Sequence, residues 1–408
     1  MNEVRFENAV GAQGSQLRPQ GSVLILDAFG GDYFDQLACT LRRRGVRVVR
    51  VSSVGALTEK GVRRLTRWMR DQGLYDAYVS LSEVGEDGAL PKRLGGGPIL
   101  DVLAEENTLA AANCEHPAIS ALARRGLAYR RFPPLRLIDK FEVNAILERA
   151  GVLTPPQMRA SDISAKEAVA RFGLPLVVKA AIGAAGQGVR IGDSLEEVER
   201  ALEDLNAKSR GGAFYQKYID GHMVMYGAVT GTEGALLEHG FCVMANCWPL
   251  GPSAVVRVFD DPDLLAAGRL VTRTLGCLGL AEIGFIRDRD GKVWHVDANV
   301  RCWGNMISLL CAGIDYPAAY LALLRGQACG PQRPADAVGR VQIEVLPFAL
   351  LQAAMRGSRR ELSARLAAFM TMCRRGPGRR YGAILLAKTL TLLAQRGLRS
   401  LSRHGSEL

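Results

Sequence analysis

The chain has 408 residues, of which 48% are hydrophobic and 23% are charged. This length suits two or three packed domains, and the balance of apolar and charged residues excludes a disordered chain. Nine cysteines, an odd number without a CxxC pair, argue against a disulfide framework and a zinc ribbon, so we expect a reducing, cytoplasmic location. The first ten residues lack the features of a signal peptide, and the longest apolar run, 382–394, is too short to span a bilayer.

The net charge of +11 is concentrated at the carboxyl end. Residues 356–408 hold 12 Lys and Arg against two acids, so this tail carries +10 and the rest about +1. Leucines at helical spacing predict amphipathic helices that dock on the body and leave the arginines in solvent. Contact with a membrane surface or an acidic partner is the alternative. A nucleic-acid partner is not favoured, because no recognition motif accompanies the charge.

The amino-terminal part alternates strand and helix patterns, which predicts an open α/β domain that reaches about residue 115. The patterns occupy 22–29, 33–44, 46–51, 77–82 and 99–112. The first three form a βαβ unit, but FGGDYF lacks the three-glycine spacing of a dinucleotide fingerprint. The domain is therefore either a scaffold or a ligand-binding unit.

The next segment, 131–157, predicts a helix between two Pro-Pro pairs. Asp139 gives the helix an acidic start and Gly151 ends it. Lys140 would lie in the first turn, where a cation is unfavourable unless it reaches a negative group. Lysines at helix starts are usually solvated, so this position alone indicates little.

A glycine-rich loop then follows a lysine-bearing strand. The strand is 176–180 and contains Lys179. Gly183, Gly186 and Gly188 allow backbone N–H groups to approach phosphate oxygens, and the lysine supplies the balancing charge. A flexible Gly/Ala hairpin is the alternative. The loop is not a P-loop, because no Gly-Lys-Ser/Thr ends it and a strand, not a helix, follows.

The segments before the last hairpin predict helices and strands in alternation. They are a helix at 194–208, a strand at 213–221, a run of strands over 224–260 and a helix at 260–279. The backbone of the strand at 213–221 would offer an adenine edge one acceptor and one donor.

Residues 280–304 carry the densest group of polar side chains. The polar residues that alternate with apolar ones are His295, Asp297, Asn299 and Arg301. A two-residue turn at Asp290-Gly291 would place Gly284 opposite Asp297 and Glu282 opposite Asn299. Opposed side chains have Cβ atoms about 5 Å apart, so these groups would converge on one ligand. Their oxygens suit Mg²⁺ and the arginine suits a phosphate; a solvated surface ladder of salt bridges is the alternative.

Taken in this order, the motifs resemble those of the ATP-grasp superfamily. The segments that carry the resemblance are Asp139-Lys140, Gly151 to Pro155, Lys179, 183–188, Gln216 to Gly221 and Asp297 to Arg301. They correspond to the family's Asp-Lys helix start, strand lysine, glycine-rich lid, hinge strand and Glu-x-Asn-x-Arg hairpin. The ending Asn299 to Gly304 is most similar to the carboxylate–amine ligase branch. The resemblance covers about residues 20–330.

The resemblance implies an α/β (α+β) ATP-grasp fold with a Rossmann-like pre-ATP-grasp domain at the amino end and a helical, basic tail. The expected divisions are the pre-ATP-grasp domain at 1–115, a connecting helical segment at 116–150, the lid subdomain at 151–222, the C-terminal ATP-grasp subdomain at 223–335 and the basic extension at 336–408.

The resemblance also implies ATP and Mg²⁺ as cofactors and assigns residues to them. Lys140 and Lys179 would contact the phosphates, and the loop with Gly183, Gly186 and Gly188 would close over them. Contacts to adenine and ribose would come from Gln216, Lys217, Tyr218 and Ile219. The metal ligands would be Asp297, Asn299 and Glu282. Arg301 would face the transferred phosphate, and Arg257 the substrate carboxylate or its acyl phosphate.

The implied function is an ATP-dependent ligase that joins a small carboxylate to an amine through an acyl phosphate. The family usually has an acid at the position of Gly284. Either Glu282 replaces that acid, or the protein is a non-catalytic or regulatory homologue that binds nucleotide. A homodimer also stays open. The substrate pocket has no readable code, and Gly30 to Asp32, His222 and Cys302 are its only candidates.

Overall fold

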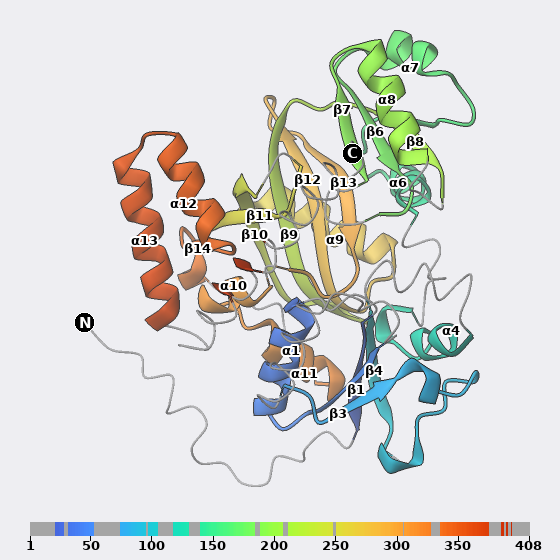
Figure 1. Cartoon of the computed structure of the whole chain (residues 1–408), viewed down its shortest axis with the longest axis vertical. Helices are drawn as coiled ribbons and strands as arrows, with labels where there is room; N and C mark the ends of the chain where they lie inside the picture. The colour runs from blue at the N-terminus through green and yellow to red at the C-terminus, as the bar shows by residue number, and fades with distance from the viewer. Residues whose placement is uncertain are drawn as a thin grey trace, which may run out of the picture.

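The structure is a computed structural model of mixed α/β architecture built around three sheets (Figure 1). The residues that it describes are 21–27, 32–52, 74–94, 97–104, 117–129, 139–183, 188–206, 211–247, 250–304, 306–327, 335–374 and five positions between 385 and 393.

The amino-terminal sheet is parallel throughout, with strand order β3-β2-β1-β4. Its strands are β1 (Ser22–Asp27), β2 (Arg47–Ser52), β3 (Ala77–Ser80) and β4 (Ile99–Ala104). Helix α1 (Asp32–Arg43) connects β1 to β2, and α4 (Pro117–Ala123) follows β4. The unbroken apolar run of β1 is buried on both faces, as parallel strands require. The predicted βαβ unit is present.

The smallest sheet is antiparallel, with strand order β5-β8-β6-β7. Its strands are β5 (Gln157–Arg159), β6 (Leu176–Ala180), β7 (Val189–Gly192) and β8 (Ala213–Lys217). Helices α7 (Ala165–Phe172) and α8 (Leu195–Asn206) contribute Ala168 and Val198 to the core with Val178 and Tyr215. Lys179 and Gln216 therefore project from the opposite face of this lid sheet.

The largest sheet has six strands in the order β13-β12-β9-β10-β11-β14. Its strands are β9 (Gly221–Gly231), β10 (Gly234–Asn246), β11 (Ser253–Phe259), β12 (Gly279–Asp288), β13 (Val293–Asn299) and β14 (Val341–Ile343). Helices α6 (Lys140–Arg149) and α9 (Pro262–Thr274) cover one face. Gly268 allows α9 to lie close to the sheet, because a Cβ there would be 2.2 Å from Tyr226. Helices α10 (Met306–Cys311) and α11 (Tyr316–Leu324) cover the other face, where they pack with α1.

The carboxyl-terminal helices lie beside the β14 edge (Figure 1). They are α12 (Leu346–Met355) and α13 (Arg359–Arg374), which pack on each other. The remaining short helical turns are η2 (Leu81–Glu83), η3 (Lys92–Leu94), η4 (Leu127–Tyr129) and η5 (Ala335–Ala337). Within the described part of the chain, no helix combines the length and apolar content that crossing a membrane would require.

The β12–β13 hairpin differs from the prediction near its turn. Asp288 N donates to Lys292 O (3.0 Å), so residues 289–291 form the turn in place of a two-residue Asp-Gly turn. The predicted pairs Glu282–Asn299 and Gly284–Asp297 are present at the other end. Both facts hold because Val296 is an extra residue on β13 between the pairs Gly284–Asp297 and Phe285–His295. This β-bulge compensates for the different turn.

Candidate functional site

Helix α6 delivers Lys140 to the edge of the large sheet. Asp139 caps the helix by accepting hydrogen bonds from Phe141 N (3.0 Å) and Glu142 N (3.2 Å). Lys140 is therefore the first residue of the helix, where its charge opposes the helix dipole. Its Nζ forms an ion pair with Asp297 on β13. The positive charge of Lys140, unfavourable at a helix start, is thus neutralised by Asp297, which lies 157 positions away in the chain.

The lid sheet delivers Lys179 to the same place. The side chain is buried, and its Nζ donates to Val296 O at 3.2 Å. Val296 is the bulged residue, which has no paired residue on β12. The lid is attached on this side by a second contact, in which Lys140 N donates to Ala181 O (2.9 Å).

Because of the bulge, His295 lies on a different face of β13 from the one predicted. His295 does not join Asp297, because Phe285 and Gly284, their respective partners, project to opposite faces of β12. His295 is buried, lies edge-on to Phe285 and bonds to Asn144 on α6 (Nδ1 to Oδ1, 3.0 Å). It has a structural position in the core.

A chain of hydrogen bonds joins the remaining polar groups of the hairpin. Arg301 Nη2 donates to Asn299 Oδ1 (2.9 Å). Asn299 Nδ2 in turn lies 3.2 Å from Glu282 Oε2 and 3.4 Å from Asp297 Oδ2. The structure thus brings together Lys140, Lys179, Glu282, Asp297, Asn299 and Arg301, which we call the polar cluster.

Burial sets the charges on the lysine side of the polar cluster. Burial lowers the pKa of Lys179 to about 8; Asp297 opposes this shift and Lys140 adds to it. Burial alone would raise the pKa of Asp297, but Lys140, Lys179 and Arg301 together hold this pKa below its ordinary value. Asp297 is therefore ionised and surrounded by cations.

The second carboxyl behaves in the opposite way. Burial and then Glu344 raise the pKa of Glu282 to about 8, against the effect of Arg301. Near neutral pH, Glu282 is therefore largely protonated. The cations of the polar cluster then outnumber the ionised carboxylates that contact them, which favours an anionic ligand such as a polyphosphate.

A buried amide on strand β8, the predicted hinge strand, points to a bound ligand. Gln216 is buried, and its Nε2 has no hydrogen-bond partner among the described residues. It shares the lid face with Lys179. Lys217 ends β8, and Tyr218 and Ile219 follow it as half-buried residues. An acceptor on a nucleotide would satisfy the amide of Gln216.

The glycine loop is described at its two ends only. Gly183 and Gly188 lie close together: a Cβ on Gly188 would be 3.8 Å from Gly183 Cα and 3.0 Å from Ala180 Cβ. Ala180 N donates to Gly188 O (2.8 Å), so the loop begins and ends at the strand that carries Lys179. Gly186 lies outside the described residues.

The donor set fits a magnesium ion that is also bound by phosphate oxygens. Mg²⁺ commonly takes one or two carboxylates together with phosphates and water, and Asp297, Glu282 and Asn299 supply two carboxyls and an amide. Across the described chain, however, no three His, Cys, Asp or Glu side chains are grouped as ligands of one ion. A Cβ on Gly284 would be 3.5 Å from both Asp297 Cβ and Met225 Sδ, an ordinary contact distance. Packing around position 284 therefore leaves room for a Cβ and does not require a glycine there.

Several candidate residues lie outside the polar cluster. Arg257 is exposed, and the register through Cys242 and Val224 places it on the face of Phe285, opposite to Gly284. Its predicted role at the reacting groups is therefore wrong. Cys302 is fully buried in the core and His222 is exposed at the start of β9. Gly30 and Gly31 lie outside the described residues, as does the side chain of Asp32.

Sequence reasoning missed Glu344. This buried residue directly follows β14, and its neighbour Gln342 pairs with Val256 on the face of Gly284. Glu344 therefore shares that face and accepts a hydrogen bond from Ser253 Oγ. The negative charge of Glu344 raises the pKa of Glu282, although β14 and β12 are not neighbours in the strand order of the sheet. The alternation of residues 341–344 was the only available signal, and it does not indicate proximity to Glu282.

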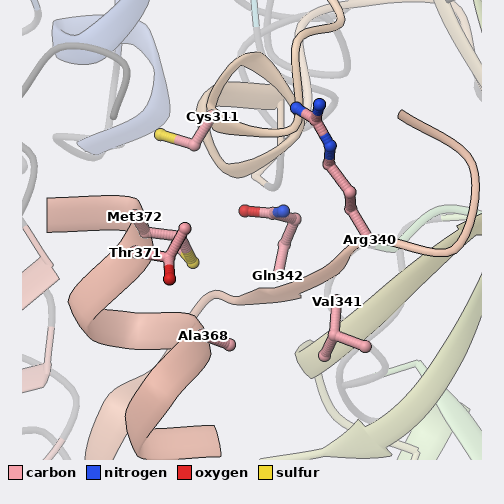
Figure 2. Close-up of a pocket in the computed structure, with 7 residues that line it drawn as sticks. All are labelled: Cys311, Arg340, Val341, Gln342, Ala368, Thr371 and Met372. Atoms are coloured by element: carbon pink, nitrogen blue, oxygen red, sulfur yellow. The ribbon is translucent and has the colours of Figure 1, made fainter. Parts of the chain in front are cut away.

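A cavity of about 220 Å³ lies away from the polar cluster, between α10, β14 and α13. Figure 2 shows Gln342 between Cys311 and Met372, with Arg340 beside it. None of the residues that line this cavity belongs to the polar cluster, so the cavity is separate from the candidate site.

Comparisons with known proteins find a family match in the middle of the chain. Residues 139–226 match the family described as the carbamoyl-phosphate synthase L chain, ATP binding domain. Pyruvate carboxylase 1 of Caenorhabditis elegans is 22% identical over 275 residues, which are 62% of this chain and 22% of that protein. A D-alanine–D-alanine ligase of Desulforudis audaxviator is 30% identical over 163 residues, 39% of this chain and 45% of that protein. The chain thus spans less than half of the length of either relative.

Solved structures share the fold over most of the chain. The ADP complex of purK, an N5-carboxyaminoimidazole ribonucleotide synthetase, gives a TM-score of 0.60 at 12% identity and covers 83% of this chain and 85% of its own. The biotin carboxylase domain dimer of Hydrogenobacter thermophilus 2-oxoglutarate carboxylase, with MgADP, ADP and bicarbonate, gives 0.56 at 18% identity over 78% and 72%. An L-amino acid ligase from Bacillus licheniformis gives 0.54 at 18% identity over 75% and 74%. Together with the ordered motifs, the matched ATP-binding segment and the shared fold indicate the ATP-grasp superfamily.

Proposed function

We propose that the protein is an ATP-dependent carboxylate–amine ligase that forms an amide or peptide bond through an acyl phosphate. The observation that carries the proposal is the meeting of Lys140, Lys179 and Arg301 around Asp297, with Glu282 and Asn299 beside them. The cations come from three separate segments of the chain. This convergence is suited to phosphoryl transfer, which depends on positioning and charge neutralisation more than on covalent protein chemistry.

The proposed reaction has two steps. A carboxylate oxygen of the first substrate attacks the γ-phosphorus of ATP, and the bond from that phosphorus to the β-phosphate oxygen breaks, which releases ADP. The nitrogen lone pair of the amine then attacks the acyl carbon, the carbon–oxygen bond to phosphate breaks, and the ammonium proton goes to solvent. Lys140 and Lys179 hold the phosphates, Arg301 stabilises the charge of the transferred group, and Gln216 orients the base.

The parts of the fold take distinct roles in this proposal. The lid sheet would close over the phosphates with its glycine loop, and the large sheet would supply Asp297, Asn299 and Glu282 to Mg²⁺. A bound Mg²⁺ would neutralise phosphate charge and fix the direction of transfer. The parallel amino-terminal sheet corresponds to the pre-ATP-grasp domain, and small carboxylates and amines are the proposed substrates.

A binding-only function is the second candidate, because one observation favours it. Gly284 leaves the polar cluster without the acid that would face Asp297, and among the described residues no three His, Cys, Asp or Glu side chains are grouped so that they could hold one metal ion. Such a protein would bind nucleotide and close its lid without turnover.

The test measures ADP release from Mg²⁺-ATP with amino acids and other small carboxylates, each with and without an amine, and identifies the amide by mass spectrometry. We expect substrate-stimulated ADP, and a loss of about 100-fold or more in Lys179→Met, because one preorganised charge contact is worth that much. The matched control is Lys166→Met, an exposed lysine of α7, which keeps the wild-type rate.

The outcomes separate the two candidates. Nucleotide binding that is lost in Lys179→Met, together with no stimulated ADP for any substrate pair, supports the binding-only function. Equal ADP release by Lys179→Met and the wild type would remove the polar cluster from the reaction altogether.

A further inference from the structure

Exposed apolar side chains are concentrated at the carboxyl end. Of the twelve large hydrophobic side chains that the described residues expose, seven lie at or after position 351. They are Leu351, Met355, Leu366, Met370, Leu386, Leu390 and Leu393. Exposed leucines that are scattered singly are ordinary, but a concentration of them on neighbouring helices indicates an interaction surface.

Four of these residues lie on α12 and α13, which together we call the C-terminal hairpin (346–374). On α12, Phe348 and Ala349 pack into the core while Leu351 and Met355, four residues apart, point outward. Met355 is 78% exposed. Helix α12 is therefore anchored through Phe348 and Ala349 and exposes Leu351 and Met355.

The second helix of the hairpin has the same division. Its buried residues are Arg365, which donates to Ala349 O, and Met372, which accepts from Ile343 N at 3.1 Å. Leu366 (43% exposed) and Met370 (49% exposed) are again four residues apart on the outer side.

Positive charge accompanies the exposed apolar residues. Met355 ends α12, and Arg356, Arg359 and Arg360 are exposed in the turn and the first residues of α13. The whole segment 356–408 carries 12 Lys and Arg against two acids. Flexible aliphatic side chains next to arginines favour the boundary between lipid headgroups and acyl chains.

We propose that the C-terminal hairpin docks on the surface of an anionic lipid bilayer. Leu351, Met355, Leu366 and Met370 enter the interface, and the arginines bind lipid phosphates. The charge argues against a second copy as the occupant, because a two-fold interface would place the same cationic surface against itself. The hairpin lies on the side of the molecule away from α7 and α8 of the lid (Figure 1).

The test is flotation of the full chain with vesicles of phosphatidylcholine alone and with about one third phosphatidylglycerol, at physiological salt. We expect binding to the anionic vesicles and little to the neutral ones. Leu366→Ser/Met370→Ser should reduce the partition coefficient by about tenfold or more, because burial of apolar area drives interfacial insertion. Arg359→Gln/Arg360→Gln should reduce it several-fold on anionic vesicles.

A matched double variant controls for the loss of exposed apolar area as such. Ile191→Ser/Val338→Ser removes side chains of similar exposure, 37% and 48%, outside the hairpin, on β7 and in the turn after η5, and should bind as the wild type does. Thermal melting of each variant confirms that it is folded.

Three results would overturn the proposal. One is no flotation of the wild type with anionic vesicles. Another is salt-sensitive binding that Leu366→Ser/Met370→Ser leaves unchanged, which would indicate an acidic partner recognised by charge alone. The third is a dimer in sedimentation that the same variant dissociates, which would make the hairpin a subunit interface.

Discussion

Glu282 is a buried carboxyl and Asp297 a half-buried one, and both are within reach of one amide, yet they hold protons very differently. Asn299 Nδ2 lies 3.2 Å from one and 3.4 Å from the other. Asp297 faces Lys140 and Lys179, whereas Glu282 faces the like charge of Glu344. A metal ion that binds both oxygens must therefore displace a proton from Glu282 but not from Asp297.

The first prediction concerns this proton. Because the pKa of Glu282 is raised to about 8, protons compete with Mg²⁺ below that pH, and the apparent Mg²⁺ affinity should rise up to about tenfold per pH unit between 6.5 and 8. Glu282→Gln should bind Mg²⁺ more weakly and without this pH dependence. The measurement is the Mg²⁺ concentration that gives half-maximal ADP formation or nucleotide binding, at several pH values. A wild-type affinity that does not change with pH would show that Glu282 does not bind the ion.

The second prediction adds the missing acid. Gly284→Asp places a carboxylate beside Asp297, and the ordinary contact distances around its Cβ allow the fold to be kept. Like charges should lower the melting temperature without Mg²⁺, and added Mg²⁺ should restore it by stabilising the folded state that binds it. Gly284→Asn is the uncharged control and should show neither effect. A melting temperature of Gly284→Asp that ignores Mg²⁺ would place the ion elsewhere.

At the scale of elements, the bulge at Val296 gives strand β13 two different functions. On the turn side, His295 packs under α6, and on the other side Asp297 faces the lid. The extra residue allows both, because it shifts the alternation of side chains by one position.

The third prediction follows from the burial of His295. Burial lowers the pKa of His295 to about 3, below the ordinary 6.5, so the unfolded chain binds the proton more readily. Stability is therefore complete above pH 6.5 and is lost as the pH falls toward 3, by about 2 kcal/mol at pH 5 for one such histidine. His295→Gln should show a smaller loss of unfolding free energy between pH 8 and pH 5 in urea titrations.

His222 supplies the matched control for this experiment. It is exposed at the start of β9, so His222→Gln removes a histidine without disturbing the core, and the same urea titrations of this variant give the baseline for a histidine substitution. Equal pH dependence in His295→Gln and the wild type would show that His295 is not buried as a neutral group.

The local parts of the site were predictable from the sequence, and their long-range relations were not. Proline, glycine and capping signals located Lys140 at a helix start. The pairs Glu282–Asn299 and Gly284–Asp297 were predicted from a two-residue turn, and they are present because the bulge at Val296 compensates for the longer turn. The bulge could not be predicted, because one extra residue in a strand produces no distinctive sequence pattern beyond a single break in the apolar–polar alternation. The face of Arg257 depends on the register of three other strands, which a single sequence does not specify.

At the scale of the whole molecule, the amino-terminal sheet and the large sheet share one core. Phe34 and Leu37 of α1 pack in the same cluster as Trp303, Tyr316 and Tyr320. Polar contacts reinforce this packing. Tyr320 donates to buried Asp101 on β4, and Arg44 forms two bonds of 2.8 and 2.7 Å with Asp315. The mixed α/β fold was predicted, whereas this docking of α1 on α11 had no readable pattern.

The fourth prediction compares these two contacts. Tyr320→Phe removes a donor from a buried carboxylate and should lower the free energy of unfolding by about 1–3 kcal/mol. Arg44→Gln breaks a partly exposed ion pair and should cost less than about 1 kcal/mol. Chemical unfolding of both variants measures the difference. A larger loss in Arg44→Gln than in Tyr320→Phe would contradict the assignment of the buried contact as the stronger one.

The place of the C-terminal hairpin also decides which parts of the molecule a membrane would leave free. The hairpin packs beside β14, and it lies on the side of the molecule away from α7 and α8 of the lid (Figure 1). With the hairpin on a bilayer, the lid sheet would therefore point away from the membrane. The lid could then open and close over the nucleotide site while water-soluble reactants reach it from the opposite side.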